Sequence, residues 1–169
     1  MKVTEPIRLA LIGIFALLLQ LTIMLSYPEW RVGFDLYLVY ILILTTTRGP
    51  AMGGTYAMLG GLFLDAFSGQ HLVFHLLFYL LPVGIGSLVR SHMLIEFKSL
   101  GTLTVGGLLL FKVVAELVGA MLLGHIDSAF YIFRVNYLSI LLFCGLVYLF
   151  WPALVNLMPP AQGGRRVGY

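Results

Sequence analysis

Two oppositely charged residues, Lys112 and Glu116, stand inside a long apolar segment that runs from Gly101 to Leu123. A charged side chain costs free energy to bury, about 2.5–3.5 kcal/mol where the surroundings are lipid. The spacing of four residues places both side chains on one face of a helix, where each can neutralise the other. Two interpretations stay open: an internal pair that fixes helix packing, or a polar site for a partner helix or a proton.

A third charged residue, Asp65, stands near the end of a glycine-rich segment, within the stretch Gly60 to Gly69. Its carboxylate can accept hydrogen bonds from the start of the following helix, or it can lie near Arg31 or Arg134 of another connection. A carboxylate at a helix end in interfacial water is the third interpretation.

The remaining reactive side chains do not form a catalytic or metal-binding pattern. Of the four histidines, only His71 and His75 have the i, i+4 spacing of a helix, and no third ligand accompanies them. The sequence has no phosphate-binding loop and no Ser-His-Asp arrangement of a known type. The lone cysteine, Cys144, lies in an apolar run and is expected to be buried filler. We therefore expect no enzyme, no metal and no cofactor.

The composition indicates which elements hold these residues. Hydrophobic residues make up 60% of the 169 residues and charged residues 10%, where globular domains have roughly a quarter charged. The mean hydropathy is +1.01. A helix needs about 20 apolar residues to cross a membrane, so the chain has room for about six. The sequence predicts an all-α integral membrane protein, a six-transmembrane-helix bundle, with one helical domain over 1–155 and a disordered cytoplasmic tail over 156–169.

The predicted spans are separated by short polar connections. The second is only fourteen residues long, which predicts a short span, and Pro82 predicts a kink in the fourth. The segments 90–100 and 124–134 are expected to be loops. The six predicted spans cover residues 7–26, 34–47, 51–67, 72–89, 101–123 and 135–155.

Small residues recur every four positions in the third predicted span, at Gly53, Ala57 and Gly61. This spacing gives one smooth helical face that a neighbouring backbone can approach closely. We expect the third span to pack inside the bundle. Together with Asp65 and the Lys112/Glu116 pair, this stripe is the candidate for organising the fold and a groove for a partner.

The basic residues predict the orientation. They stand singly between apolar segments, a pattern of membrane topology and not of nucleic-acid binding. Only Arg31 and Arg134 fall on the side opposite the termini, where Asp35, Asp65 and Asp127 are also expected. This asymmetry places both termini in the cytoplasm. The basic residues on the side of the termini are Lys2, Arg8, Arg48, Arg90, Lys98, Arg165 and Arg166.

The stretch from Pro28 to Arg90 resembles the rod shape-determining protein MreD family of bacteria. The features in common are the turn Arg48-Gly49-Pro50, the segment from Gly60 to Gly69 with Asp65 followed by Ser-Gly, and the entry to the next span at His75. Family members often have glycine in place of Val73. Length, number of spans and motif order support the resemblance together.

The resemblance implies a non-enzymatic scaffold of the cell-elongation machinery in the bacterial cytoplasmic membrane. Such a scaffold binds MreC, a protein with one transmembrane helix. The resemblance further implies links to RodA, to a class B penicillin-binding protein and to the MreB filament. It associates the chain with cell shape and lateral peptidoglycan synthesis.

The main alternative is the substrate-binding membrane subunit of an energy-coupling-factor vitamin transporter. Such subunits have the same size and six spans, and the predicted fold is similar to theirs. They need a polar pocket that faces outward and small residues on the first span to dock the coupling subunit. The first span has Ala10, Gly13 and Ala16 in a suggestive series.

Overall fold

The computed structural model describes residues 4–26, 34–68, 74–92, 98–122 and 126–157. All the regular structure in these residues is helical, as predicted, and no strand occurs in them. The helices are α1 (Thr4–Ser26), α2 (Leu36–Arg48), α3 (Pro50–Ser68), α4 (Phe74–His92), α5 (Lys98–Leu122) and α6 (Ile126–Leu157).

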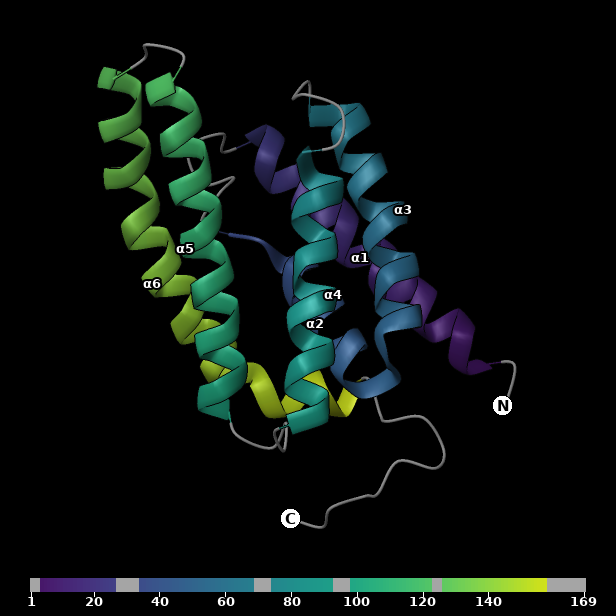
Figure 1. Cartoon of the computed structure of the whole chain (residues 1–169). Coiled ribbons are helices and arrows are strands. Elements are labelled where there is room, and N and C mark those ends of the chain that lie inside the picture. Colours follow the sequence, from purple (N-terminus) through teal and green to yellow (C-terminus); the bar gives the residue numbers. More distant parts are fainter. Residues whose placement is uncertain (1–3, 27–33, 69–73, 93–97, 123–125, 158–169) are drawn as a thin grey trace.

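The helices form two groups that share α2 (Figure 1). On one side, α5 and α6 lie against each other as a long hairpin. On the other side, α3 and α4 pack together, and α1 crosses them obliquely. Among the described elements, the backbone of the α5–α6 hairpin approaches the other helices mainly at α2. The contacts of α2 therefore decide how the two groups are held together.

The central helix, α2, is short and enclosed. It begins inside the bundle, well short of the ends of its neighbours (Figure 1), and it contacts all five other helices. Every residue from Tyr37 to Thr46 is buried. Burial of the whole helix explains its nearly unbroken apolar sequence, because no face of it meets the outside. The prediction of a short second helix over 34–47 is confirmed.

The small-residue stripe of α3 faces α2 and α4. Ala57 is fully buried, and a Cβ atom at Gly53 would collide with Thr45 of α2. A Cβ at Gly61 would lie 2.6 Å from the Cα of Leu76, so only glycine allows the backbones of α3 and α4 to approach this closely. The prediction that this helix packs inside the bundle is confirmed only for the face with the stripe, because the opposite face exposes Met58 and Leu59.

Several predicted boundaries are wrong. α6 begins at Ile126, so most of the predicted loop 124–134 is helical. α4 continues to His92 and α5 begins at Lys98, so both ends of the predicted loop 90–100 are helical, and residues 93–97 lie outside the described residues. Neither region is apolar enough to predict a helix from hydropathy alone. α6 continues to Leu157, and the rest of the predicted disordered tail, 158–169, lies outside the described residues. α4 is one helix through Pro82.

The end of the bundle that holds the start of α1 also holds the end of α6. Arg48 at the end of α2 forms an ion pair with Glu5, at 2.6 Å. Arg8 donates a hydrogen bond to the carbonyl oxygen of Leu157 at 3.1 Å. The described ends of the first and last helices thus lie together. Placement in a membrane, and the side on which these ends lie, stay predictions.

By length and hydropathy, two of the described helical segments can cross a membrane: Glu5–Ser26 and Asn136–Leu154. Shorter apolar helical segments occur at Leu36–Arg48, His75–Leu88 and Gly101–Ala115. The burial of α2 shows why its length does not reach that of a full span, since it starts within the bundle.

Candidate functional site

The candidate site is built around Asp35, the residue that precedes α2. Its carboxylate caps the helix, because Oδ1 accepts a hydrogen bond from the backbone N–H of Leu38 at 2.9 Å. The side chain is completely buried, although a capping carboxylate is usually at the surface. A helix start inside the bundle thus carries a negative charge into the core.

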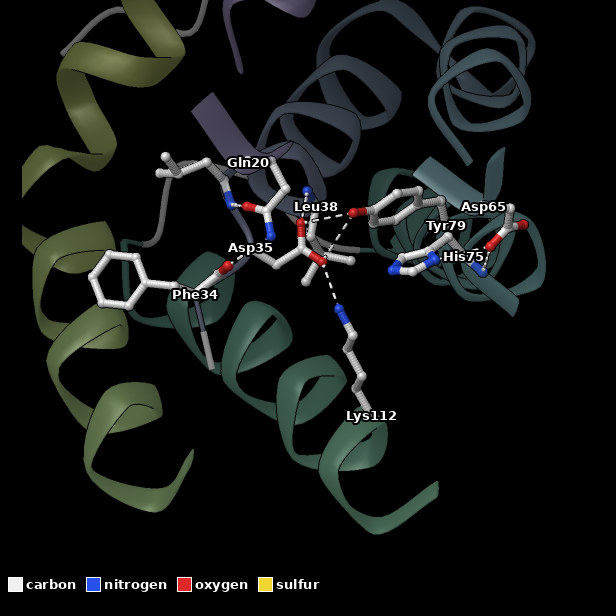
Figure 2. A network of polar contacts seen from close by, with 9 residues as sticks. Gln20, Phe34, Asp35, Leu38, Asp65, His75, Tyr79 and Lys112 are labelled. Carbon is white, nitrogen blue, oxygen red and sulfur yellow. Dashed lines mark hydrogen bonds and ion pairs between the residues drawn. The ribbon is translucent and has the colours of Figure 1, made fainter. Parts of the chain in front are cut away.

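Lys112 of α5 supplies the opposite charge. Its Nζ donates to Oδ2 of Asp35 at 3.0 Å, and both side chains are almost fully buried. The Tyr79 hydroxyl of α4 lies 3.0 and 3.1 Å from the two oxygens of the same carboxylate. Nζ also lies 5.3 Å from the ring centroid of Phe78. Figure 2 shows Lys112 reaching from α5 to Asp35. We call Asp35, Leu38, Tyr79 and Lys112 the Asp35 cluster.

Gln20 of α1 completes the polar surroundings of this helix start. Its Nε2 donates to the carbonyl oxygen of Phe34 at 2.9 Å, and its Oε1 accepts from the N–H of Leu36 at 3.0 Å. The amide therefore bonds the two backbone groups on either side of Asp35 (Figure 2). Backbone that is not helical can be buried only when such partners are present. The interior amide of the first predicted span thus has a definite role.

A second buried carboxylate, Asp65 of α3, binds the start of α4. Its Oδ1 accepts from the backbone N–H of His75 at 2.8 Å, and its Oδ2 accepts from the N–H of Leu76 at 3.2 Å. The ring Nδ1 of His75 lies 2.8 Å from Oδ1, and since an ionised carboxylate only accepts, Nδ1 carries the proton. We call Asp65, His75 and Leu76 the Asp65 cluster. Tyr79 of the Asp35 cluster lies between Asp35 and His75 in Figure 2.

The predicted site residues lie in two regions of the structure. The stripe and Asp65 form one region on α3, and Lys112 of α5 lies in the other, at the Asp35 cluster. The stripe Gly53, Ala57 and Gly61 lies at the contacts of α3 with α2 and α4, and Asp65 lies beside it at the start of α4. Of the alternatives for Asp65, acceptance from the start of the following helix is the one observed. Arg31 lies outside the described residues.

Of the predicted Lys112/Glu116 pair, the structure describes the side chain of Lys112 only. Lys112 pairs with Asp35, and the side chain of Glu116 lies outside what the structure describes. Asp35 was expected on or near the external face; its side chain is fully buried inside the bundle, and the side of a membrane toward which it lies stays a prediction. Asp35 lies 77 positions from Lys112 in the sequence, and the predicted pairing of Lys112 with Glu116 stays a prediction.

Sequence reasoning missed Asp35, Tyr79 and Gln20 as one site. One signal was present, because Asp35 directly precedes an apolar run and aspartate is a preferred helix N-cap. Nothing in a local pattern indicates that this cap lies in the core. The pairing of His75 with Asp65 was not predicted either, since His75 was considered only as a possible metal ligand and as part of the family resemblance. The described residues hold no group of three side chains suited to a metal ion.

The contacts of the Asp35 cluster join the start of α2 to α4 and α5. The carboxylate accepts from a backbone N–H, a hydroxyl and an ammonium group, so its charge is bonded from three directions. Such a cluster fixes the relative positions of the helices that contribute to it.

In comparisons with known proteins, the chain matches no protein-family model, no curated protein and no solved structure.

Proposed function

We propose that this chain is a multi-spanning membrane protein that acts as a non-enzymatic scaffold of the MreD kind, binding the single-span protein MreC. The observation that carries the proposal is the inward arrangement of the polar groups within an apolar outer surface. A bundle of this kind offers a partner the sides of its helices and its short connections. Control of cell shape and of lateral peptidoglycan synthesis then follows from the partners that the scaffold holds, among them RodA, a class B penicillin-binding protein and MreB.

The outer surface supports placement in a membrane. Phe15 of α1 is 69% exposed, Leu122 of α5 is 82% exposed and Leu149 of α6 is 72% exposed. Soluble monomers rarely expose apolar patches of more than a few hundred Å². Exposed large apolar side chains occur on α1, α3, α4, α5 and α6, so the surface as a whole suits lipid and not one local interface. The most exposed include Leu11, Leu25, Leu59, Leu77, Leu88, Leu103 and Leu138.

The interior supports a scaffold over an enzyme or a solute-binding protein. Asp35, Lys112 and Tyr79 bond to each other, and Asp65 bonds to the start of α4. These polar groups bond to partners within the chain and join its helices. A partner would then be recognised through the sides of the helices, because helix–helix packing is the means of recognition within lipid.

One observation weighs against the vitamin-transporter alternative. A Cβ atom at Gly13 would lie 3.0 Å from the hydroxyl oxygen of Tyr40, so this glycine faces α2. Ala16 packs against the core as well. Two of the three small residues of the α1 series are therefore used inside the bundle, whereas docking of a coupling subunit needs the series on the outer face.

Co-purification from bacterial membranes tests the proposal. The tagged chain is extracted in mild detergent, and MreC of the same organism is expected to be enriched over a tagged six-span membrane protein of unrelated function. Recovery of the coupling subunits of a vitamin transporter, or of a tightly bound vitamin, in place of MreC would overturn the scaffold assignment. A chain that stays soluble and folded without detergent would overturn the membrane assignment itself.

A further inference from the structure

Positive charge gathers at the end of the bundle where the start of α1, the turn between α2 and α3 and the end of α6 lie (Figure 1). Arg48 of α2 pairs with Glu5 of α1 at 2.6 Å. Arg8 follows Glu5 by three residues on the same face of α1, and its charge acts on the same carboxylate. Two guanidinium groups therefore adjoin one carboxylate, and one positive charge is left over. We call Glu5, Arg8 and Arg48 the Arg48 cluster.

The hydrogen-bonding capacity of Arg48 is only partly used. Its side chain is 4% exposed, and within the described part of the chain its Nε is buried without a hydrogen-bond partner. A guanidinium has five N–H donors, and a buried donor without an acceptor costs free energy. Glu5 accepts from Nη2 through Oε1, and at 23% exposed it is the more accessible member of the pair. A second acceptor beside Glu5 would therefore be favourable.

The start of α3 adds to the positive potential. This helix begins at Pro50, two residues after Arg48, and its first turn has no acidic residue. The first N–H groups of a helix have no carbonyl partner within the helix and carry partial positive charge. Pro50 and Ala51 are exposed, so the helix start is accessible. The Arg48 cluster and the start of α3 together favour an anion at this end of the bundle.

The neighbouring surface of α1 indicates which anion fits. Leu11 and Phe15 follow Arg8 at i+3 and i+7, so all three share one helical face, and they are 61% and 69% exposed. In a membrane-spanning bundle the helix ends lie at the depth of the lipid headgroups. Arginine binds phosphate oxygens through paired N–H groups. A cationic cluster at the end of an exposed apolar face therefore matches a phospholipid, with its phosphate at the arginines and an acyl chain along the helix.

We propose that the Arg48 cluster, with the start of α3, binds the phosphate of an anionic phospholipid whose acyl chains lie along Leu11 and Phe15. Arg8 makes the outer contact, and Arg48 supplies the buried charge. One anionic lipid neutralises the charge that Glu5 leaves over, whereas a zwitterionic lipid brings a positive group as well. Glu5 competes with the phosphate for both arginines. The inference rests on the membrane placement in the proposed function but not on which protein partner is bound.

Native mass spectrometry of the delipidated protein in detergent tests the site, with phosphatidylglycerol, phosphatidylcholine and inorganic phosphate as probes. The first phosphatidylglycerol is expected to bind more tightly than phosphatidylcholine, and Arg8→Gln or Arg48→Gln to weaken it about fivefold. Glu5→Gln is expected to tighten it, because the competing carboxylate is gone. Arg134→Gln is the matched control, since Arg134 is an exposed arginine near the start of α6, at the opposite end of that helix, and this variant is expected to keep the affinity unchanged.

Equal affinities in Arg8→Gln, Arg48→Gln and Arg134→Gln would overturn the site, and so would equal binding of the two lipids. Displacement of phosphatidylglycerol by inorganic phosphate at similar concentration would overturn the lipid as the ligand. If Arg48→Gln does not accumulate, Arg8→Gln and Glu5→Gln decide through their opposite changes. A protein that needs detergent but shows no lipid preference would remove this inference alone, whereas a protein that folds without detergent would remove the membrane placement as well.

Discussion

The two buried carboxylates of this protein hold helices together in different ways. Asp65 binds the start of the very next helix, ten and eleven residues along the chain, beside the close contact of Gly61 with Leu76. Asp35 also binds the helix that follows it, but its charge is balanced by Lys112, 77 residues away on α5. The first arrangement needs only neighbouring residues, and the second needs the whole bundle to be assembled.

This difference predicts how each of the two contacts responds to mutation. Beside the Asp65 cluster, the backbones of α3 and α4 pack closely at Gly61 and Leu76. A rearrangement of side chains cannot replace this backbone contact. The Asp35 cluster is supported by charge, which is strong in a low dielectric and is lost when one partner is removed. We expect damage at α3–α4 to abolish folding and damage at α2–α5 to weaken one attachment. Four substitutions, from the largest expected effect to the smallest, test this contrast.

The largest effect is expected from Gly61→Leu. A Cβ atom already lies 2.6 Å from the Leu76 backbone, and the leucine side chain would force α3 and α4 apart. The variant is expected not to accumulate as a folded protein, as measured by gel filtration in detergent after membrane extraction. Gly84→Leu on α4 is the control, because no described atom lies within 4 Å of its Cβ position. Equal yields of the two variants would show that the α3–α4 contact is not close-packed.

Lys112→Met is expected to cost less, about 3–5 kcal/mol in the free energy of unfolding, since it leaves a buried carboxylate without its counter-charge. Detergent-denaturation curves of the purified protein measure this loss. Asp35→Asn/Lys112→Met is expected to be more stable than Lys112→Met alone.

The same double-mutant cycle with Glu116→Ala tests the predicted pairing of Lys112 with Glu116. A stronger coupling of Lys112 to Glu116 than to Asp35 would show that Asp35 is not the main partner of Lys112.

These two substitutions also mark what the sequence can predict. The all-helical fold, the short second helix and the burial of the Gly53/Ala57/Gly61 stripe follow from apolar runs and residue spacing, which are local properties. The pairing of Asp35 with Lys112 does not, because it depends on α2 beginning inside the bundle and on α5 passing that point. Hydropathy likewise misplaced the start of α6, since residues 126–134 are helical without being strongly apolar.

Tyr79→Phe is expected to have a moderate effect, about 1.5–3 kcal/mol, because the hydroxyl donates to a charged acceptor. The ring stays in place, so packing against Tyr37, with centroids 5.4 Å apart, is retained. Thermal unfolding in detergent is expected to show a lower midpoint. Tyr148→Phe, on an exposed position of α6, is the control and is expected to leave the midpoint unchanged. A midpoint equal to that of the control would mean that Asp35 is sufficiently bonded by Lys112 and Leu38.

The smallest effect is expected from His75→Phe, at about 1 kcal/mol. The ring bond to Asp65 is lost, but the carboxylate keeps the backbone N–H groups of residues 75 and 76, which any side chain at position 75 leaves in place. The same thermal measurement checks it. A loss larger than that of Tyr79→Phe would contradict the contrast, because the Asp65 cluster would then depend on its side-chain partner as much as the Asp35 cluster does. A smaller loss would mean that the backbone N–H donors and the close packing of Gly61 with Leu76 hold the α3–α4 contact.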